Sequence, residues 1–192
     1  MSGIWIFGYG SLIWRPAMAF RTSRVARLAG WTRRFWQGSH DHRGLPHAPG
    51  RVVTLVAAPQ ASCDGLAYLV DRDVVETVFR NLDHREKNGY ERHAVRLTFR
   101  DGGVVDAIVY IAAVGNHAWL GPAGDEEMVR QICQAAGPSG ANIDYLNDLA
   151  AALRDLEIKD PHVFRLESMA RAFMARQEGG DGHTIRQASS KL

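Results

Sequence analysis

The stretch GIWIFGYGSL, from Gly3 to Leu12, constrains the fold more than any other part of this sequence. Its four bulky apolar residues, 4–7, form a β-prone run that passes directly into a Gly-Tyr-Gly-Ser turn. Gly8 and Gly10 can adopt backbone angles that other residues avoid, so consecutive amide groups could face one side and bind a carboxylate or phosphate oxygen. The spacing fits neither a Walker loop nor a dinucleotide-binding loop. From these residues alone, a structural turn at the end of a first strand is the simpler interpretation.

Length and composition indicate a single soluble globular domain. The chain has 192 residues, of which 46% are hydrophobic and 23% charged, as is ordinary for a protein with a packed core. The formal net charge is only +2 and the basic residues are scattered among 21 acidic ones, so a nucleic-acid partner is not expected. There is no signal-like N-terminus and no apolar run of about 18 residues. We therefore expect a cytoplasmic protein without a membrane partner.

The first two-thirds of the chain reads as mostly β-structure. Alternating or continuous apolar patterns predict strands over 4–7, 24–39 (one long strand or a pair), 52–58, 64–70, 90–99 and 104–114. Pro59 is expected to form a turn between two of these strands, and Arg-Asp-Gly-Gly at 100–103 predicts a hairpin. The only helix expected in this part covers 71–87, with Asp71 or Asp73 as N-cap and Gly89 ending it.

The last third reads as helical. Apolar spacing predicts helices over about 125–136, from Asn142, and from Pro161 with Asp160 as N-cap. Strands that follow one another before a group of helices indicate an α+β fold, here a small curled or closed sheet with helices outside it. We expect one domain over 1–178 and a polar, disordered tail over 179–192. Cys63 and Cys133 form no disulfide or metal pattern and are expected to be reduced core thiols.

Glu86 is the strongest single candidate for chemistry. It falls in the last turn of its predicted helix, where the helix dipole disfavours a carboxylate, and Asp83 on the same face would repel it. Both effects raise a carboxyl pKa, which suits a general base near neutral pH. Arg85 and Lys87 could cancel the effect. On these residues alone, a solvated charge at a helix end remains the simpler interpretation.

Two further segments carry polar or aromatic clusters. The segment 39–51 holds three histidines, at positions 40, 42 and 47, but nothing completes a metal site, so no metal is expected. Its arginines, Arg43 and Arg51, could pair with a substrate carboxylate or form surface salt bridges. The segment WTRRFWQ, 31–37, interleaves basic and aromatic residues as binders of single-stranded nucleic acid do. Because its aromatic residues alternate onto both faces, core packing is favoured.

Taken together, these pieces resemble one known family. The motifs FGYGSLIW, RRFWQGSHDHRG, PGRVVTLV, LDHREKNGY and WLGPAG occur in this order between Phe7 and Gly124. The chain is similar to the ChaC-type glutathione-specific γ-glutamylcyclotransferases from about Ile4 to Arg176. The resemblance implies a compact, γ-glutamylcyclotransferase-like mixed or antiparallel β-barrel with surrounding helices. It also implies cleavage of glutathione into 5-oxoproline and cysteinylglycine without a cofactor.

The resemblance also implies the site residues. The family's catalytic glutamate matches Glu86, which would act as general acid and base. Its γ-glutamyl-binding loop matches Ile6, Phe7, Gly8, Tyr9, Gly10 and Ser11. Arg43 of His-Arg-Gly and Tyr110 of the late strand match substrate-contacting residues. Trp119 stands where the family usually has Tyr, His40 where it has Thr, and Ser39 where some members have Asp; these departures bear on substrate preference.

Two other functions stay open on sequence grounds. The first is the same cyclisation acting on other γ-glutamyl amines or dipeptides, which would differ only at the cysteinylglycine end. The second is a non-enzymatic regulatory module linked to cation transport. Glu86 argues against the second, because a binding module needs no base at that position. The oligomeric state cannot be inferred from these patterns.

Overall fold

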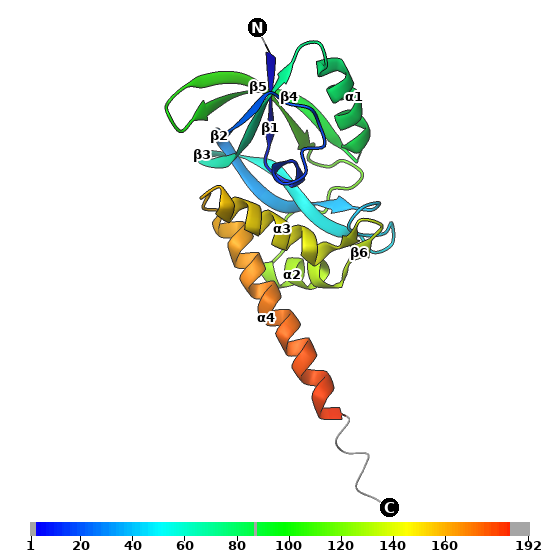
Figure 1. The fold of residues 1–192 in the computed structure, drawn as a ribbon. Helices are drawn as coiled ribbons and strands as arrows, with labels where there is room; N and C mark the ends of the chain where they lie inside the picture. The colour runs from blue at the N-terminus through cyan, green and yellow to red at the C-terminus, as the bar shows by residue number, and fades with distance from the viewer. Residues whose placement is uncertain (1–2, 87, 185–192) are drawn as a thin grey trace, which may run out of the picture.

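The computed structural model describes residues 3–86 and 88–184, and five of its strands close into a barrel (Figure 1). Around the barrel the order is β1-β3-β2-β4-β5, and β5 returns to β1. The pairing of β1 with β5 is parallel and the other pairings are antiparallel. The strands are β1 (Gly3–Gly8), β2 (Thr22–Ser39), β3 (Gly50–Asp71), β4 (Tyr90–Phe99) and β5 (Val104–Ala112). The expected α+β barrel with outer helices is confirmed.

The second and third strands are longer than the sequence pattern suggested. The prediction of a turn at Pro59 is wrong, because β3 runs through it without interruption. Trp31 pairs with Ala57 and Ala29 with Ser62, so residues 58–61 face Gly30 across a bulge. Gly30 has a φ of +81°, which bends β2 at this point. A proline inside a bulge removes no ladder hydrogen bond, so the strand tolerates it.

Helix α1 (Val75–Arg85) covers one side of the barrel (Figure 1). Its apolar face packs on Ile6 and Tyr110 through Val75, Val78, Phe79 and Leu82. The predicted N-cap is wrong: the cap residue is Val74, which offers no side-chain bond, and Asp71 still belongs to β3. Glu86 is the C-cap residue rather than part of the last turn. The helix therefore ends before Gly89, which was predicted to end it; Gly89 has a φ of +87° and precedes β4.

The remaining helices form a layer against the other side of the barrel (Figure 1). They are α2 (Asp125–Gln134), α3 (Asn142–Asp155) and α4 (Pro161–Thr184), and a small hairpin of β6 (Ala136–Gly137) and β7 (Gly140–Ala141) joins the first two. Asp160 caps α4 as predicted, its Oδ1 accepting the Val163 N–H at 3.1 Å. The segment expected to be a polar tail from Gly179 overlaps the end of α4, and 185–192 lie outside the described residues.

One core is shared by the barrel and the helix layer. Phe7 and Phe35 fill the barrel interior, and Leu146, Leu149 and Leu166 join them from α3 and α4. Cys63 is buried and Cys133 half-buried, and both are free thiols. In the described part of the chain, none of the helices combines the length and the apolar character needed to cross a membrane.

Candidate active site

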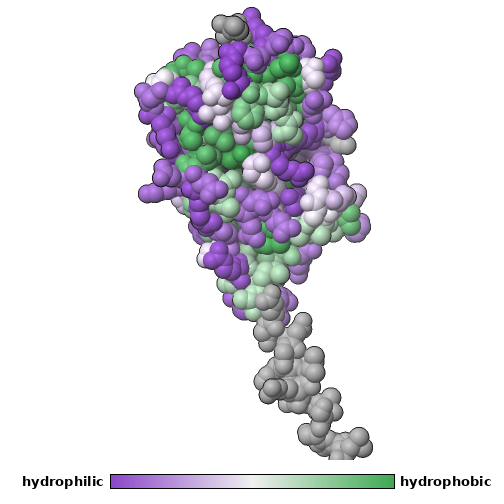
Figure 2. Space-filling view, viewed as in Figure 1, coloured by the Kyte–Doolittle hydropathy of each residue, from purple (hydrophilic) through white to green (hydrophobic). Residues whose placement is uncertain are grey.

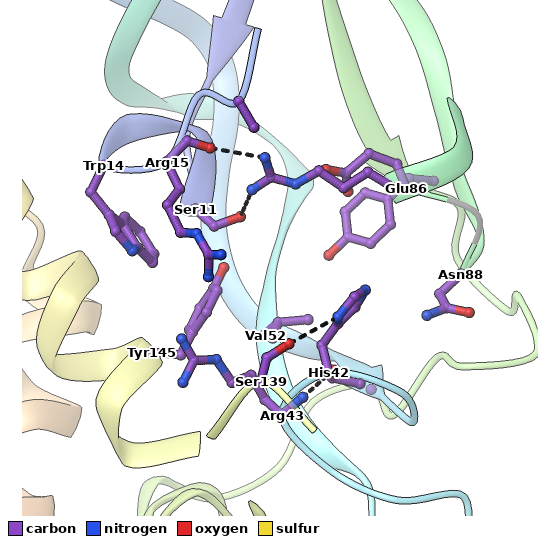
Figure 3. Close-up of a pocket in the computed structure, with 15 residues that line it drawn as sticks. Ser11, Trp14, Arg15, His42, Arg43, Val52, Glu86, Asn88, Ser139 and Tyr145 are labelled. Carbon is purple, nitrogen blue, oxygen red and sulfur yellow. Dashed lines mark hydrogen bonds and ion pairs between the residues drawn. The ribbon is translucent and has the colours of Figure 1, made fainter. Parts of the chain in front are cut away.

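A cavity of about 330 Å³ opens beside the turn that follows β1 (Figure 3). This turn continues into the 3₁₀ helix η1 (Ser11–Ile13). A smaller hollow of about 40 Å³ adjoins the cavity and reaches toward the barrel core. The two spaces share four lining residues: Ser11, Glu86, Tyr90 and Tyr145. The larger one is in the size range of small-molecule sites, and the smaller one can enclose only part of a ligand.

The glycines of the turn are needed for close packing. Neither has a positive φ, but Gly10, with φ −121° and ψ −134°, lies outside the standard helical and extended regions. A Cβ atom on Gly10 would lie 2.9 Å from Val53 Cγ2 and 3.0 Å from the Tyr145 hydroxyl oxygen, and one on Gly8 would lie 2.8 Å from Leu12 Cβ. Close packing is therefore a reason for these two glycines that the sequence reasoning did not give. Without side chains, the backbone itself forms part of the cavity wall at Gly10.

The predicted loop residues divide between the cavity wall and its support. Phe7, Tyr9, Gly10 and Ser11 line the smaller hollow. Ile6 is fully buried and packs on the other side of β1, against α1. Gly8 packs behind the loop, where it lies against Leu12 and Tyr68. The loop therefore presents its later residues to the cavity, and its first residues hold it to the sheet.

Glu86 lies at the boundary between the two spaces, and its side chain is only 16% exposed. Burial raises its pKa above the usual value of a glutamic acid, and the neighbouring Arg85, with Nε 3.4 Å from Oε1, offsets part of that rise. The sequence had pointed to a raised pKa for other reasons, the helix dipole and Asp83. Asp83 instead accepts hydrogen bonds from Tyr110 at 2.7 Å and from Arg92 at 3.1 Å.

Tyrosines surround Glu86 on the side of the hollow. The Tyr9 hydroxyl donates to the Tyr110 carbonyl and the Tyr90 hydroxyl to the Val53 carbonyl, both at 2.8 Å. Burial raises the pKa of Tyr9 and Tyr90 well above the usual value and that of Tyr145 to about 12. These phenols therefore stay protonated near neutral pH, and Glu86 is the one carboxyl group among the described residues that line the hollow.

Arg43 enters the larger cavity from the loop between β2 and β3 (Figure 3). Its guanidinium donates to the Ala141 carbonyl at 3.0 Å and lies 3.9 Å from the Asp148 carboxylate. Its backbone N–H donates to Ser39 Oγ at 3.0 Å, which fixes the loop. The side chain is buried except for 10% of its surface. Its position beside Ser139 suits recognition of an anionic group at this end of the cavity.

Arg85 is a site residue that the sequence reasoning treated only as a neighbour of Glu86. Its guanidinium crosses the cavity rim and donates to Ser11 Oγ at 2.7 Å and to the Arg15 carbonyl at 2.8 Å (Figure 3). This ties the end of α1 to the turn after β1. Tyr145 was also missed, because its place in the helix pattern of α3 does not distinguish a core residue from a cavity residue.

The three residues that differ from the family pattern lie in different parts of the structure. Ser39 is buried in the cavity wall, where it accepts the bond from Arg43. Trp119 instead packs edge-on against Trp36, with ring centroids 6.2 Å apart, and Gln37 bridges to its backbone. The Nε2 atom of His40 lies near Gly38. Among the side chains that the structure describes, no group of three or more His, Cys, Asp or Glu is placed to hold a metal ion.

Known proteins with related sequences share most of this chain. The glutathione-specific γ-glutamylcyclotransferase 1 of Danio rerio is 41% identical over 173 residues, covering 87% of this chain and 88% of that protein. The glutathione-specific γ-glutamylcyclotransferase of Schizosaccharomyces pombe is 35% identical and covers 90% of this chain and 95% of its own length.

Solved structures agree with this relationship. A crystal structure of a γ-glutamyl cyclotransferase specific to glutathione from yeast superposes with a TM-score of 0.84 at 30% identity, over 90% of this chain and 97% of that one. A more distant γ-glutamyl cyclotransferase, 14% identical with a TM-score of 0.56, shares the fold. The model of the ChaC-like protein family matches residues 4–173. This chain belongs to the ChaC-like protein family.

Proposed function

We propose that this protein is a γ-glutamylcyclotransferase that converts reduced glutathione into 5-oxoproline and cysteinylglycine. The observation that carries the proposal is the position of Glu86, a largely buried carboxyl of raised pKa at the junction of a ligand-sized cavity and a small hollow. The names of the relatives, which are glutathione-specific γ-glutamylcyclotransferases, support the choice of substrate.

The reaction needs a base but no external nucleophile. The α-amine of a γ-glutamyl group can reach its own γ-carbonyl and close a five-membered ring. The new bond joins the α-nitrogen to the carbon atom of the γ-carbonyl group, and the bond from that carbonyl carbon to the cysteine nitrogen breaks. Glu86 takes a proton from the α-ammonium, whose reference pKa is about 7.7–8.0, and returns it to the leaving nitrogen. A carboxyl of raised pKa is suited to both steps.

The turn after β1 is proposed to stabilise the negative charge that develops during ring closure. In this proposal its backbone amides face the γ-carbonyl oxygen, which becomes negative as the ring closes. A preorganised donor of this kind contributes roughly 2.7–4 kcal/mol to lowering the barrier. The small hollow beside Glu86 would hold the γ-glutamyl chain in a bent form, which keeps its amine close to its carbonyl. Tyr110 also lines this hollow and its carbonyl accepts a hydrogen bond from Tyr9, so in this proposal it contacts the γ-glutamyl chain.

Arg43 is proposed to bind a carboxylate of glutathione. The change Arg43→Ala is expected to raise KM about 10-fold to 100-fold with a smaller effect on kcat, as loss of one charge-assisted contact of roughly 1.5–3 kcal/mol predicts. Arg92→Ala, which alters an exposed arginine paired with Asp83 outside the cavity, is the matched control. Steady-state kinetics with glutathione gives both constants. An unchanged KM in Arg43→Ala would remove this residue from substrate binding.

The pH dependence of kcat/KM should report Glu86. Because the base must be ionised, activity should fall as pH decreases through a pKa that lies above the usual value for glutamic acid. Arg85 lowers that pKa, so Arg85→Gln should move the acid limb to higher pH. The titration of the substrate itself is the same in both proteins and cannot produce the shift. Profiles from pH 4 to 9 that superpose after scaling would argue against Glu86 as the base.

A direct assay separates the candidate functions. Millimolar reduced glutathione is incubated with the protein, and 5-oxoproline and cysteinylglycine are followed by mass spectrometry. Turnover of γ-glutamyl-alanine in preference to glutathione would favour a cyclotransferase for other γ-glutamyl compounds. No turnover of any γ-glutamyl compound would favour a regulatory module without catalytic activity. The proposed cytoplasmic location, where glutathione is reduced, can be checked by cell fractionation.

A further inference from the structure

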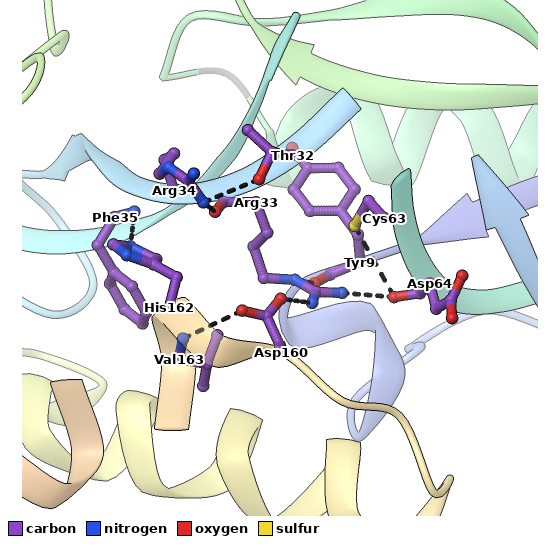
Figure 4. A network of polar contacts seen from close by, with 10 residues as sticks. All are labelled: Tyr9, Thr32, Arg33, Arg34, Phe35, Cys63, Asp64, Asp160, His162 and Val163. Atoms are coloured by element: carbon purple, nitrogen blue, oxygen red, sulfur yellow. Dashed lines mark hydrogen bonds and ion pairs between the residues drawn. The ribbon is translucent and has the colours of Figure 1, made fainter. Parts of the chain in front are cut away.

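A buried charge lies behind the active-site turn at Arg33 of β2, and each of its three guanidinium nitrogens has a protein partner (Figure 4). Its side chain is 1% exposed. It donates from Nε to the Tyr9 carbonyl at 2.6 Å and from Nη2 to the Asp64 carbonyl at 2.7 Å, and its Nη1 pairs with Asp160. One guanidinium therefore joins β2, β3, the start of α4 and the turn after β1.

Arg33 lies outside both cavities of the candidate site, whereas Tyr9 and Gly10 line the smaller one. Any effect of Arg33 on the reaction must therefore pass through the backbone that it binds. The contact falls on the carbonyl of the Tyr9–Gly10 peptide, in the middle of the Gly-Tyr-Gly-Ser turn.

The planarity of that peptide gives the contact a directional consequence. In a trans peptide, the carbonyl oxygen and the next N–H point in opposite directions. Holding the Tyr9 oxygen toward Arg33 therefore turns the Gly10 N–H away from it. A charged donor on the carbonyl also polarises the peptide and makes its N–H a stronger donor.

We propose that Arg33 is a positioning residue for the reaction: by fixing the Tyr9 carbonyl behind the turn, it directs the Gly10 amide into the hollow beside Glu86. This inference rests on the proposed function, in which the turn stabilises the γ-carbonyl oxygen. It assigns that task to one amide and names the side chain that orients it. Asp160 pairs with a different nitrogen of the guanidinium, and its Oδ1 caps α4, so this pair joins Arg33 to the helix layer.

Only arginine can make this set of contacts from one position. Its planar fork carries donors on three nitrogens, and here all three are used in different directions. A lysine keeps the charge but concentrates its donors on a single nitrogen. Arg33→Lys can therefore still pair with Asp160, but it cannot also hold the Tyr9 carbonyl in place.

The test is kinetic and uses Arg33→Lys. Loss of one oxyanion donor costs about 10²–10³ in kcat, so misorienting one is expected to lower kcat roughly 10-fold to 100-fold, with KM changed less than about 3-fold. A purely structural role would instead reduce the amount of folded enzyme, and the kcat of the folded fraction would stay at the wild-type value. Thermal unfolding followed by circular dichroism gives the folded fraction.

Asp160→Asn is the matched control. It removes the charge partner of Arg33 but leaves the bond to the Tyr9 carbonyl, so it should lower the melting temperature and keep kcat within about 2-fold of the wild type. Glu167→Gln, which removes the charge from the partly buried ion pair of Glu167 with Arg154 between α3 and α4, is a second control remote from the turn. An equal fall of kcat in Arg33→Lys and in these controls would overturn the inference.

Nuclear magnetic resonance of the wild-type protein provides a readout that needs no variant. Titration with 5-oxoproline should shift the Gly10 amide proton, and no shift at saturation would overturn the inference. Wild-type kcat in Arg33→Lys would overturn it as well, while leaving the proposed function intact. Absence of any turnover by the wild-type protein would instead contradict the proposed function, and the role of Arg33 with it.

Discussion

Glu86→Gln is expected to lower kcat by about 10²–10⁴ while leaving KM within a few-fold of the wild-type value, because general acid–base catalysis contributes an effect of this size. The amide has nearly the same shape as the carboxylate, so the cavity keeps its form. It cannot, however, accept the proton of the α-ammonium. Production of 5-oxoproline from glutathione measures kcat, and the same assay over a range of glutathione concentrations gives KM.

The surroundings of Glu86 suit the uncharged amide, so the loss of activity should not come from a loss of stability. Because the side chain is 16% exposed and its pKa is raised by burial, the amide should be accommodated without loss of stability. Glu91→Gln, at an exposed position in β4, makes the same chemical change outside the cavity and should retain full activity. If Glu86→Gln kept more than about a tenth of the wild-type kcat, another group would have to be the base.

Local patterns predicted much of the fold. The hairpin at 100–103, the Asp160 cap and the start of α3 at Asn142 depend on neighbouring residues, and the structure has them where the sequence indicated. The failures involve partners distant in sequence. Pro59 breaks an isolated strand, but in this fold it falls inside a bulge opposite Gly30, a partner that only the pairing of β2 with β3 reveals.

In the candidate site, too, features set by neighbouring residues could be predicted, and features set by residues distant in sequence could not. Residue type and motif order identified Glu86, Arg43 and the turn after β1. They could not show that burial sets the pKa of Glu86, because burial depends on how the turn packs against α1 and β4. Arg33 belongs to the motif quoted for the family resemblance, yet nothing in the sequence connects it with the Tyr9 carbonyl.

The glycines of the site illustrate how the sequence can identify a residue but only part of its role. Their presence in the turn suggested unusual backbone angles, which Gly10 has, but both glycines also allow a close approach of neighbouring atoms. The glycine with the least room for a side chain beside this turn is Gly65 of β3, which the sequence reasoning did not select. A Cβ atom there would lie 2.3 Å from the carbonyl oxygen of Gly8 and 2.9 Å from Phe7 Cζ.

Gly65→Ala is therefore expected to be more damaging to the turn after β1 than a methyl group added at Gly8 or Gly10. The atom that a Cβ would meet is backbone, so β1 must move away from β3 where the sheet passes into the turn. Overpacking of this kind costs about 1–3 kcal/mol or more. At about 2–4 °C per kcal/mol for a chain of this size, the melting temperature should fall by roughly 2–12 °C.

The same displacement should also affect turnover, because Gly8 leads directly into Tyr9 and Gly10. Measured below the melting temperature, kcat of Gly65→Ala should fall more than 10-fold, since a misplacement of about 1 Å can cost about 10² in rate. Gly124→Ala is the control: its φ is −64°, and a Cβ there meets nothing within 4 Å. A Gly65→Ala protein with wild-type kcat would mean that the turn keeps its geometry independently of β3, and Arg33 would then be its principal support.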